Sequence, residues 1–520
     1  MTRRAFAEQL LKSSALLLSA PACLRHLEAA PSIARASAPL ITHGVASGDV
    51  TDTTAVIWSR TDRPARMIVE WSTRESFSNR RRIAGPVTGP EADFTAKILL
   101  QRLPRGQRIL YRVFFEDRGS GRGHAEPHIG ELVTATRGRG DVHFAWSGDT
   151  CGQGYGIDSS RGGMLTYLAM RNLRPDFFVH SGDTIYADNP LETELKLADG
   201  SGVWRNLVTE EKSKVAETLA EFRGNHRYNL LDTHVRAFNA AVPIVAQWDD
   251  HEVRNNWFPG QLIDDPRYHI RDVNTLARHA RQAFCDYFPI RPDRKGRIYR
   301  NIQRGTACEL FILDLRSYRG ANSANRQSQI SPDTAYMGRE QLDWLTTALK
   351  HSRATWKIIC SDMPIGMVVA DGKAFENCSN GNGPPLGREL EIAALLRFLK
   401  QHRIRNVLWL TADVHHAVSH HYDPARAQFT DFDPFWEFVS GPLHAGTFGP
   451  SQLDDTFGPA VRWNSRAKGA PTTGPHSKEQ FFGTVRIDGL TQVATVTHWN
   501  RDGEKLWSIE LPPDRLSKSR

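Results

Sequence analysis

Residues 177–186 read Phe177-Phe178-Val179-His180-Ser181-Gly182-Asp183-Thr184-Ile185-Tyr186, and they begin with a hydrophobic run that leads into Ser-Gly-Asp. Residues 144–149 read Phe144-Ala145-Trp146-Ser147-Gly148-Asp149 and have the same form. Each run predicts a β-strand that stops at its Ser-Gly-Asp turn, and residues 164–170 between them favour a helix. The pattern indicates a β-α-β unit with Asp149 and Asp183 at strand carboxyl ends, where the sites of α/β sheets lie.

Two further apolar runs also lead into acidic or imidazole side chains. Residues 243–247 precede Trp248-Asp249-Asp250-His251-Glu252, and residues 407–410 precede Thr411-Ala412-Asp413-Val414-His415-His416. A lone Asp after a strand is usually a capping or turn residue, but four strand ends of this kind favour one shared site. Because crowded carboxylates repel one another strongly unless cations lie among them, the sequence predicts a multinuclear metal centre.

The residues at these strand ends suit different roles. Asp183 is the expected bridging ligand, because one carboxylate can hold two ions about 3.5–4 Å apart. Tyr186 lies three residues later, where a phenolate would suit trivalent iron, and Asp149 would complete the shell of the same ion. Asp413 and His415 are separated by one residue, so both point to one side of an extended segment and can reach the metals.

Asp250 and His251 reach the predicted site on a separate loop. Neighbouring side chains point to different sides, so we expect Asp250 to bind metal and His251 to act in acid–base chemistry. A lone Tyr beside a strand is usually a core residue and a lone loop His is usually exposed. The joint occurrence of these residues at four strand ends favours a metal site over coincidence.

The rest of residues 141–520 alternates strand-like and helical segments. Strands are expected at residues 310–314 and 356–360, and a helix over residues 386–403. Residues 190–240 are charged and are predicted to be helical. The fold class is α/β, with more strands than a simple doubly wound sheet needs.

Residues 41–137 have the pattern of a small all-β domain. Short strand-like runs such as residues 55–58 and 110–115 are separated by turn residues. Leu103-Pro104-Arg105-Gly106 followed by Tyr111 is typical of a corner in fibronectin-type sandwiches. We therefore expect an N-terminal β-sandwich domain at residues 41–137 and an α/β domain at residues 141–520.

The N-terminus predicts export. Thr2-Arg3-Arg4-Ala5-Phe6 places two arginines before residues 15–18, an apolar stretch too short to span a bilayer. Residues 1–38 are interpreted as a twin-arginine signal peptide, which makes the twin-arginine export machinery a partner and the periplasm or the exterior the destination. An ordinary amphipathic helix is the alternative.

Composition narrows the remaining possibilities. The chain has 520 residues with 66 Lys and Arg against 58 Asp and Glu, a formal charge of +8, which is a mild excess for this length. There is no long basic run and no nucleic-acid motif, and no segment is long and apolar enough to be transmembrane. The spacing of the six cysteines gives no zinc motif.

The order of these motifs resembles the PhoD-like alkaline phosphatase/phosphodiesterase family, a branch of the calcineurin-like metallophosphoesterases. The resemblance extends from the N-terminus to about residue 450 and rests on long motifs: Ser-Gly-Asp at 147–149, Gly-Asp-Thr-Ile-Tyr at 182–186, Trp-Asp-Asp-His-Glu-Val at 248–253 and Asp-Val-His at 413–415. It implies a metallophosphoesterase β-sandwich flanked by helices and preceded by a small all-β fibronectin-like domain.

The resemblance also implies a phosphoric ester hydrolase with Fe³⁺ and Ca²⁺, or other divalent ions, in its site. In the wider superfamily a metal-held hydroxide attacks phosphorus, and His251 matches the histidine that assists this hydrolysis. The implied ligands divide between two ions, with Asp149, Asp183, Tyr186 and His415 holding iron and Asp183, Asp250 and Asp413 reaching the second metal.

Three positions depart from the family pattern. Known members have a cysteine where this chain has Asp149, and Cys151 lies two residues later. The superfamily has an amide ligand where this chain has Asp250, which favours harder ions. The histidine expected after residues 356–360 is absent, and Asp362 is a candidate replacement.

The expected activity is that of an exported alkaline phosphatase that acts on small phosphate monoesters. A phosphodiesterase of phospholipase D type is an alternative, since the same metals serve either substrate. A non-catalytic binding protein that uses the N-terminal sandwich is another alternative, against which the complete set of candidate ligands argues. His444 is a candidate pocket residue.

Overall fold

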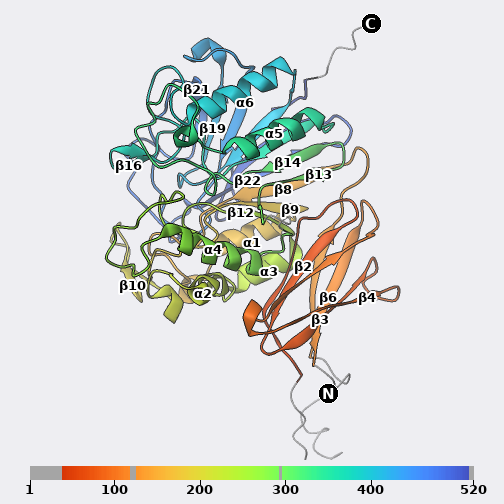
Figure 1. The fold of residues 1–520 in the computed structure, drawn as a ribbon. Coiled ribbons are helices and arrows are strands. Elements are labelled where there is room, and N and C mark those ends of the chain that lie inside the picture. The colour runs from red at the N-terminus through yellow and green to blue at the C-terminus, as the bar shows by residue number, and fades with distance from the viewer. Residues whose placement is uncertain (1–37, 118–124, 292–295, 515–520) are drawn as a thin grey trace, which may run out of the picture. The chain divides into compact units, whose positions relative to one another are not determined.

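The computed structural model describes residues 38–117, 125–291 and 296–514 (Figure 1). Residues 1–37 of the predicted signal lie outside this part of the chain. No helix among the described residues has both the length and the apolar character that crossing a membrane requires.

A nine-stranded sheet carries three of the four predicted strand ends. Its strands β8, β9 and β12 are parallel neighbours, as the β-α-β pattern predicts. In order across the sheet the strands are β24 (Lys505–Leu511), β23 (Ala494–Asn500), β22 (Phe481–Ile487), β8 (Val142–Ser147), β9 (Phe177–Ser181), β12 (Ile244–Gln247), β1 (Ile41–Gly48), β2 (Ala55–Thr61) and β5 (Thr95–Leu100).

A seven-stranded sheet carries the fourth strand end. Strands β14, β15, β18 and β20 are parallel, and the remaining strands are antiparallel to their neighbours. In order they are β13 (Arg300–Arg304), β14 (Cys308–Ile312), β15 (Trp356–Cys360), β18 (Val407–Thr411), β20 (Phe435–Val439), β19 (Val418–Tyr422) and β21 (Pro459–Asn464).

The two sheets pack face to face around one apolar core. Phe144 and Trp146 of β8 contribute to it from the first sheet, and Leu310 of β14 and Ile358 of β15 from the second. Strands of this kind read as continuous apolar runs because both faces of the strand are covered. The inner face meets the opposite sheet, and the outer face meets helices.

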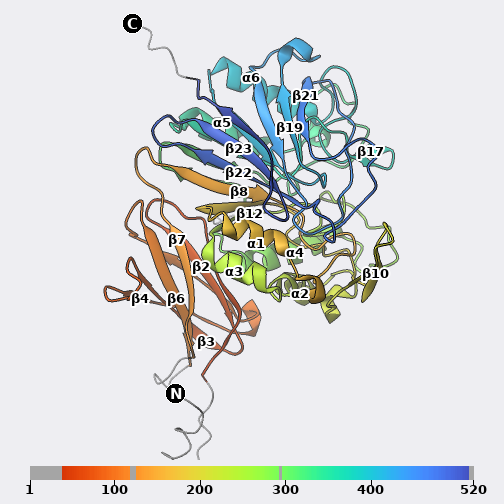
Figure 2. The same ribbon diagram turned by 180° about the vertical axis from the view of Figure 1, so that it is seen from behind.

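Helices cover the outer faces (Figures 1 and 2). Buried residues of α1 and α3 pack against the first sheet, and those of α5 and α6 pack against the second. Buried residues of α2 and α4 share a cluster beside β12. The helices are α1 (Leu165–Asn172), α2 (Leu219–Asn229), α3 (Thr233–Ala241), α4 (Val273–Tyr287), α5 (Arg339–His351) and α6 (Glu389–Gln401).

The helix starts are set by capping residues. The Thr218 side chain accepts a hydrogen bond from Glu221 N, and the Glu221 carboxylate accepts one from Thr218 N, which forms a capping box at α2. Asp232 and Asp272 cap α3 and α4 in the same manner with their carboxylates.

The N-terminal part is all β, as predicted. Strands β1, β2 and β5 pack against a four-stranded sheet whose order is β4 (Arg81–Thr88), β3 (Ala65–Ser72), β6 (Arg108–Glu116) and β7 (His128–Val133). Strand β1 joins β12 through one parallel pair, Gly48 with Ile244. A Cβ at Gly48 would collide with the Ile244 carbonyl oxygen, so this junction requires glycine. The division at residues 137–141 stays a prediction.

The helical prediction for residues 190–240 is wrong in its first half. Strands β10 (Glu194–Lys196) and β11 (Val203–Arg205) form a hairpin there. The tip between them contains Gly200 and Gly202, both at positive φ, so turn residues outweigh the charged composition. A second short hairpin, β16 (Ala370–Asp371) and β17 (Ala374–Phe375), lies at residues 370–375.

The predicted fold is otherwise confirmed: the structure is a β-sandwich flanked by helices and preceded by a β-rich N-terminal part.

Candidate metal centre

Loops after four strands bring the predicted ligands together. Asp149 follows β8, Asp183 follows β9, Asp250 follows β12, and Asp413 and His415 follow β18. In the described part of the chain, three groups hold their ligand atoms within 4.8 Å of one another, and these are Asp149, Asp183 and His415; Asp183, Asp250 and His251; and Asp249, Asp250 and Asp413. Asp183 and Asp250 are each shared by two groups, so the three groups form one continuous cluster.

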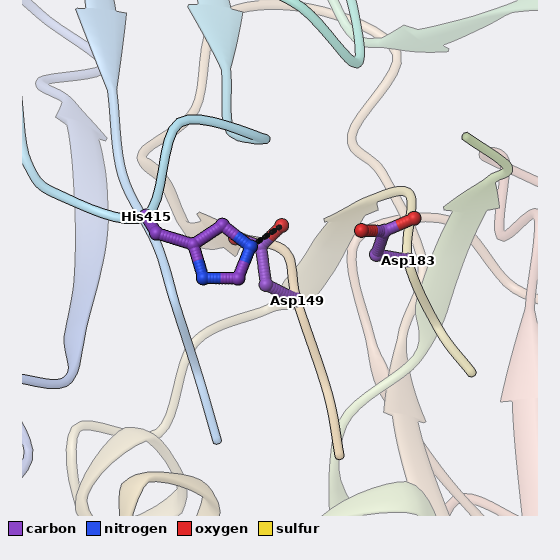
Figure 3. Close-up of side chains that lie close together, drawn as sticks. All are labelled: Asp149, Asp183 and His415. Atoms are coloured by element: carbon purple, nitrogen blue, oxygen red, sulfur yellow. Dashed lines mark ion pairs between the residues drawn. The ribbon is translucent and has the colours of Figure 1, made fainter. Parts of the chain in front are cut away.

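The first group is shown in Figure 3. Asp149 and His415 point toward one another from different loops, with 3.8 Å between His415 Nε2 and Asp149 Oδ1, and Asp183 lies beside them. Asp149 is 1% exposed, yet neither of its carboxylate oxygens accepts a hydrogen bond of normal geometry from a described residue. A buried carboxylate without donors is costly, and a cation between these side chains would satisfy it.

The backbone is strained at these residues. Asp149, Asp183, Asp413 and His415 have φ values of 66°, 50°, 68° and 54°. Residues other than glycine rarely adopt this left-handed region, and such strain concentrates at functional sites. Aspartate tolerates it better than most residues, so the carboxylates at these sharp strand-to-loop turns are locally permitted.

A backbone contact sets the tautomer of His415. Its Nδ1 hydrogen-bonds the carbonyl oxygen of Gly446. Because a carbonyl can only accept, Nδ1 carries the proton and Nε2 keeps its lone pair for the cluster. This arrangement is the one that metal-binding histidines use.

Tyr186 lies inside the same cluster. Its hydroxyl is 2.9 Å from His415 Nε2, and its ring stacks on that of His251 with centroids 4.2 Å apart. Burial, together with the charges of Asp183 and Asp149, raises the pKa of the Tyr186 phenol well above its ordinary value. Ionisation of this phenol therefore requires a cation beside it.

Glu252, to which no role was assigned from the sequence, connects two of the loops. Its carboxylate accepts hydrogen bonds from Asp183 N at 3.1 Å, Thr184 N at 2.5 Å and Asp249 N at 2.7 Å. The β9 and β12 loops are thereby fixed to one another. Its position directly after His251 is the sequence signal that could have indicated it.

His251 is held by a carboxylate that sequence analysis missed. Asp188 Oδ1 lies 2.6 Å from His251 Nδ1, and Asp188 Oδ2 accepts a hydrogen bond from Asn255 N at 2.9 Å. Burial lowers the pKa of His251, but the charges of Asp188 and Asp250 outweigh it and raise the pKa to about 9. Asp188 therefore fixes the His251 ring at the wall of the pocket over the centre.

A buried arginine supports the cluster from behind. Arg316 is 0% exposed, its Nε lies 2.6 Å from Asp249 Oδ1, and its Nη2 contacts Glu376. Asp362, the candidate replacement for the absent histidine, lies 3.7 Å from the same guanidinium and belongs to none of the three groups. Asp362 is thus placed beside the arginine.

Cys151 and His444 lie outside the centre. Cys151 is buried in an apolar cluster, and burial raises the pKa of its thiol to about 12, so it is neutral. His444 Nε2 hydrogen-bonds Gly156 O at 2.9 Å, and His444 is not among the residues that line the pocket over the centre. His444 therefore has a structural position in its loop.

The electrostatics of the cluster fit metal ions. Burial, followed by repulsion from neighbouring carboxylates, raises the pKa of Asp183 and of Asp413 well above the ordinary range. Cations among these groups would reverse that shift. The predicted ligands are four carboxylates with one imidazole and one phenol, a set that suits hard ions. The imidazole of His251 also belongs to the second group.

A pocket of about 370 Å³ opens over the cluster. Its walls include Asp183, Asp250, His251, Asp413 and His415. Four of the six predicted ligands and the predicted acid–base histidine therefore face one common space, whereas Asp149 and Tyr186 do not line it. The volume is within the size range of small-molecule sites.

Solved structures share this architecture. The structure of PhoD aligns with a TM-score of 0.64 and 19% identity, covering 93% of this chain and 94% of its own. The purple acid phosphatase PPD1 from yellow lupin (Lupinus luteus) seeds aligns with a TM-score of 0.55 and 12% identity, covering 92% of this chain and 75% of its own. This chain thus shares its fold with PhoD and with this purple acid phosphatase.

Sequence comparison identifies the family. The model of PhoD-like phosphatase matches residues 144–498, and the model of the PhoD-like phosphatase N-terminal domain matches residues 27–135. Alkaline phosphatase D of Bacillus subtilis (strain 168) is 25% identical over 444 residues, which are 80% of this chain and 71% of the relative. The chain belongs to the PhoD-like phosphatase family and is a phosphoric ester hydrolase.

Proposed function

We propose that this enzyme is an exported alkaline phosphatase that hydrolyses small phosphate monoesters with metal ions. The observation that carries the proposal is the convergence of Asp149, Asp183, Asp250, Asp413 and His415 in three overlapping groups below one pocket. Family membership supports phosphate esters as the substrate class.

We assign the two ion positions as the family resemblance implies, and the chemistry of the donor sets supports the assignment. Asp149, Asp183, Tyr186 and His415 would hold Fe³⁺, for which a phenol and carboxylates are suitable ligands. Asp183, Asp250 and Asp413 would hold Ca²⁺, which takes oxygen ligands in flexible geometry. Bound ions of this kind lower the pKa of an attacking water and neutralise charge on phosphoryl oxygens.

The protein groups supply position and a proton. Glu252 fixes the loops of Asp183 and Asp249, so the ligands are held before substrate binds. Asp188 holds His251 through Nδ1 and leaves Nε2 for the substrate. His251 then donates its proton to the departing oxygen, which avoids release of a strongly basic alkoxide.

Export is proposed from the paired arginines Arg3 and Arg4 and the short apolar stretch that follows them. We also propose residues 41–137 and 141–520 as separate domains, with the first packing beside the catalytic part. Loss of secretion after Arg3→Lys and Arg4→Lys together would support the twin-arginine route, and unchanged secretion would contradict it.

Parallel rate assays test the substrate. The protein is purified without added metal, its metal content is measured, and hydrolysis of nitrophenyl phosphate is compared with that of bis-nitrophenyl phosphate. A higher kcat/KM for the monoester is expected, whereas a higher value for the diester would establish the phosphodiesterase alternative.

The metal assignment is tested with Asp183→Ala. Because Asp183 is shared by two groups, this change is expected to remove bound iron and to lower turnover by more than about 100-fold. Asp423→Ala, which changes a cap residue outside the centre, is the matched control. Full activity of Asp183→Ala would overturn the assignment.

A further inference from the structure

The pocket over the metal centre is lined by three chemically different kinds of residue. The first is the acidic and imidazole set of the centre itself, and the second is an uncharged polar set, Gln153, Asn255, Asn256 and Ser451. The third is apolar, and its members are Val368, Val369, Ala370, Val414 and Phe448. An ester that binds here therefore has room for a phosphoryl group at the metal centre and for an apolar part against the apolar residues.

Phe448 is the largest of these apolar residues. Its ring lies on that of His415, with centroids 4.5 Å apart and an interplanar angle of 16°. The side chain is nevertheless 39% exposed, although it lines the pocket. Because this aromatic ring is exposed to water beside the metal centre, an apolar group that covers it would bind favourably by removing apolar surface from water.

The apolar walls are held in place by backbone hydrogen bonds. Phe448 N donates to His415 O at 3.3 Å, and Thr447 exchanges two bonds of 3.0 Å with Thr473. Val368 N donates to Gln452 O at 2.8 Å, which joins the two apolar segments. The surface is thus formed before a substrate arrives, which lowers the entropic cost of binding.

The described lining of the pocket offers no side-chain cation for a second negative charge. Among the described residues that line it there is no Lys or Arg. Glu376 also lines it, and its partner Arg316 is 0% exposed and so cannot meet a ligand. A leaving group that carries further phosphates would face carboxylates without a compensating side-chain cation.

We propose that the site takes esters with a single phosphoryl group whose leaving alcohol is uncharged and aromatic or otherwise apolar, with Phe448 as the surface on which that alcohol packs. This inference rests on the proposed phosphatase function and narrows its substrate class.

Phe448→Ala tests the contact with the leaving group. Phenyl phosphate and ethyl phosphate are compared, and each variant rate is divided by the wild-type rate on the same substrate so that intrinsic reactivity cancels. The KM for phenyl phosphate is expected to rise about two- to tenfold, with a smaller rise for ethyl phosphate. Phe448→Tyr keeps an aromatic ring and is expected to retain the preference for phenyl phosphate. Leu490→Ala, at an 83% exposed residue outside this pocket, is expected to leave the KM for both substrates unchanged.

The outcomes separate the alternatives. Equal losses of kcat on both esters, with loss of metal, would mean that Phe448 only supports His415 and would overturn the inference. The inference would also be overturned if Phe448→Ala left the ratio of the KM for phenyl phosphate to the KM for ethyl phosphate unchanged. If the metal-loaded wild-type protein hydrolyses neither ester, the proposed function itself fails.

A charged leaving group provides the second arm. ATP has a better leaving group than phenyl phosphate, so a kcat/KM for ATP at least about tenfold below that for phenyl phosphate indicates rejection of the added charge. Val369→Lys places a cation at the wall and is expected to raise kcat/KM for ATP. Efficient hydrolysis of ATP by the wild-type enzyme would overturn this part of the inference.

Discussion

Asp188 Oδ1 lies 2.6 Å from His251 Nδ1, and both side chains are buried. The carboxylate fixes the ring and favours its protonated form, because its charge raises the pKa of His251 against the effect of burial. Asp188→Asn keeps the shape but removes the charge. We expect kcat to fall about 10- to 100-fold, with bound metal unchanged.

His251→Ala provides the comparison for this pair. Loss of the proton donor is expected to lower kcat by about 10²–10⁴, and adding Asp188→Asn to that variant is expected to cost little more. Asp199→Asn, in an Asp–His pair with His476 that is not part of the metal centre, is the matched control and should leave kcat unchanged. Additive losses in the double variant would show that Asp188 acts independently of His251.

Gly441 lies directly against a predicted ligand. A Cβ at this position would collide with Asp149 Oδ2. Gly441→Ala is therefore expected to displace the Asp149 carboxylate and to weaken metal binding about 10- to 100-fold. Metal titration followed by turnover at saturating metal measures the effect.

Gly138→Ala is the control for this substitution, because no described atom lies within 4 Å of the Cβ it would add. The control should bind metal as the wild type does. If Gly441→Ala also binds metal normally, then either Asp149 is not a ligand or the loop of Gly441 moves away from Asp149 without weakening metal binding.

The strand ends were predictable from the sequence for a physical reason. A buried parallel strand must be apolar over four to six residues, so its end is visible wherever Ser-Gly-Asp or Asp-Asp-His begins. Parallel neighbours place those ends at one edge of a sheet, which is why Asp149, Asp183 and Asp250 meet. Residues 194–205 contain no apolar run of this kind, and a short hairpin forms there among charged residues.

The residues that support the centre left no such signal. Arg316 contacts Asp249 and Glu376, from which it is separated by 67 and 60 positions in the chain. Contacts over such distances have no period and no motif, because they depend on how whole loops pack. Asp188 is five residues after Asp183, yet its partner His251 is 63 positions away.

Arg316 compensates the negative charges of Asp249 and Glu376 behind the metal centre. Removal of this buried arginine leaves Asp249 and Glu376 without their cation and beside other buried carboxylates, among them Asp250. Arg316→Met is expected to lower the free energy of unfolding by about 3–5 kcal/mol. Urea denaturation of the metal-free protein, followed by tryptophan fluorescence, measures this change.

An exposed ion pair is the control for Arg316. Arg108 Nε lies 2.6 Å from Glu131 Oε2, and the Arg108 side chain is 54% exposed. Arg108→Met should therefore cost no more than about 1 kcal/mol. Equal effects of the two substitutions would show that burial of Arg316 does not govern its contribution.

His226 makes the stability of the fold depend on pH. Burial lowers its pKa from 6.5 to about 3, and nearby His180 adds to the shift. The folded state therefore disfavours the proton that the unfolded chain accepts below pH 6.5. Stability is fully present above pH 6.5 and falls by about 1.4 kcal/mol per pH unit as the pH drops toward 3.

His226→Phe removes this titration. The ring stacks on Tyr287 and borders a cavity of about 50 Å³, so the phenyl ring has room. Between pH 6 and 4.5 the slope of unfolding free energy against pH should decrease by about 1.4 kcal/mol per unit. Phe284→Leu, in the same aromatic cluster, should destabilise the protein equally at each pH. If His226→Phe left the slope of unfolding free energy against pH unchanged, His226 would take up its proton in the folded state. Only an imidazole that stays neutral in the folded state and is protonated in the unfolded state contributes to this slope.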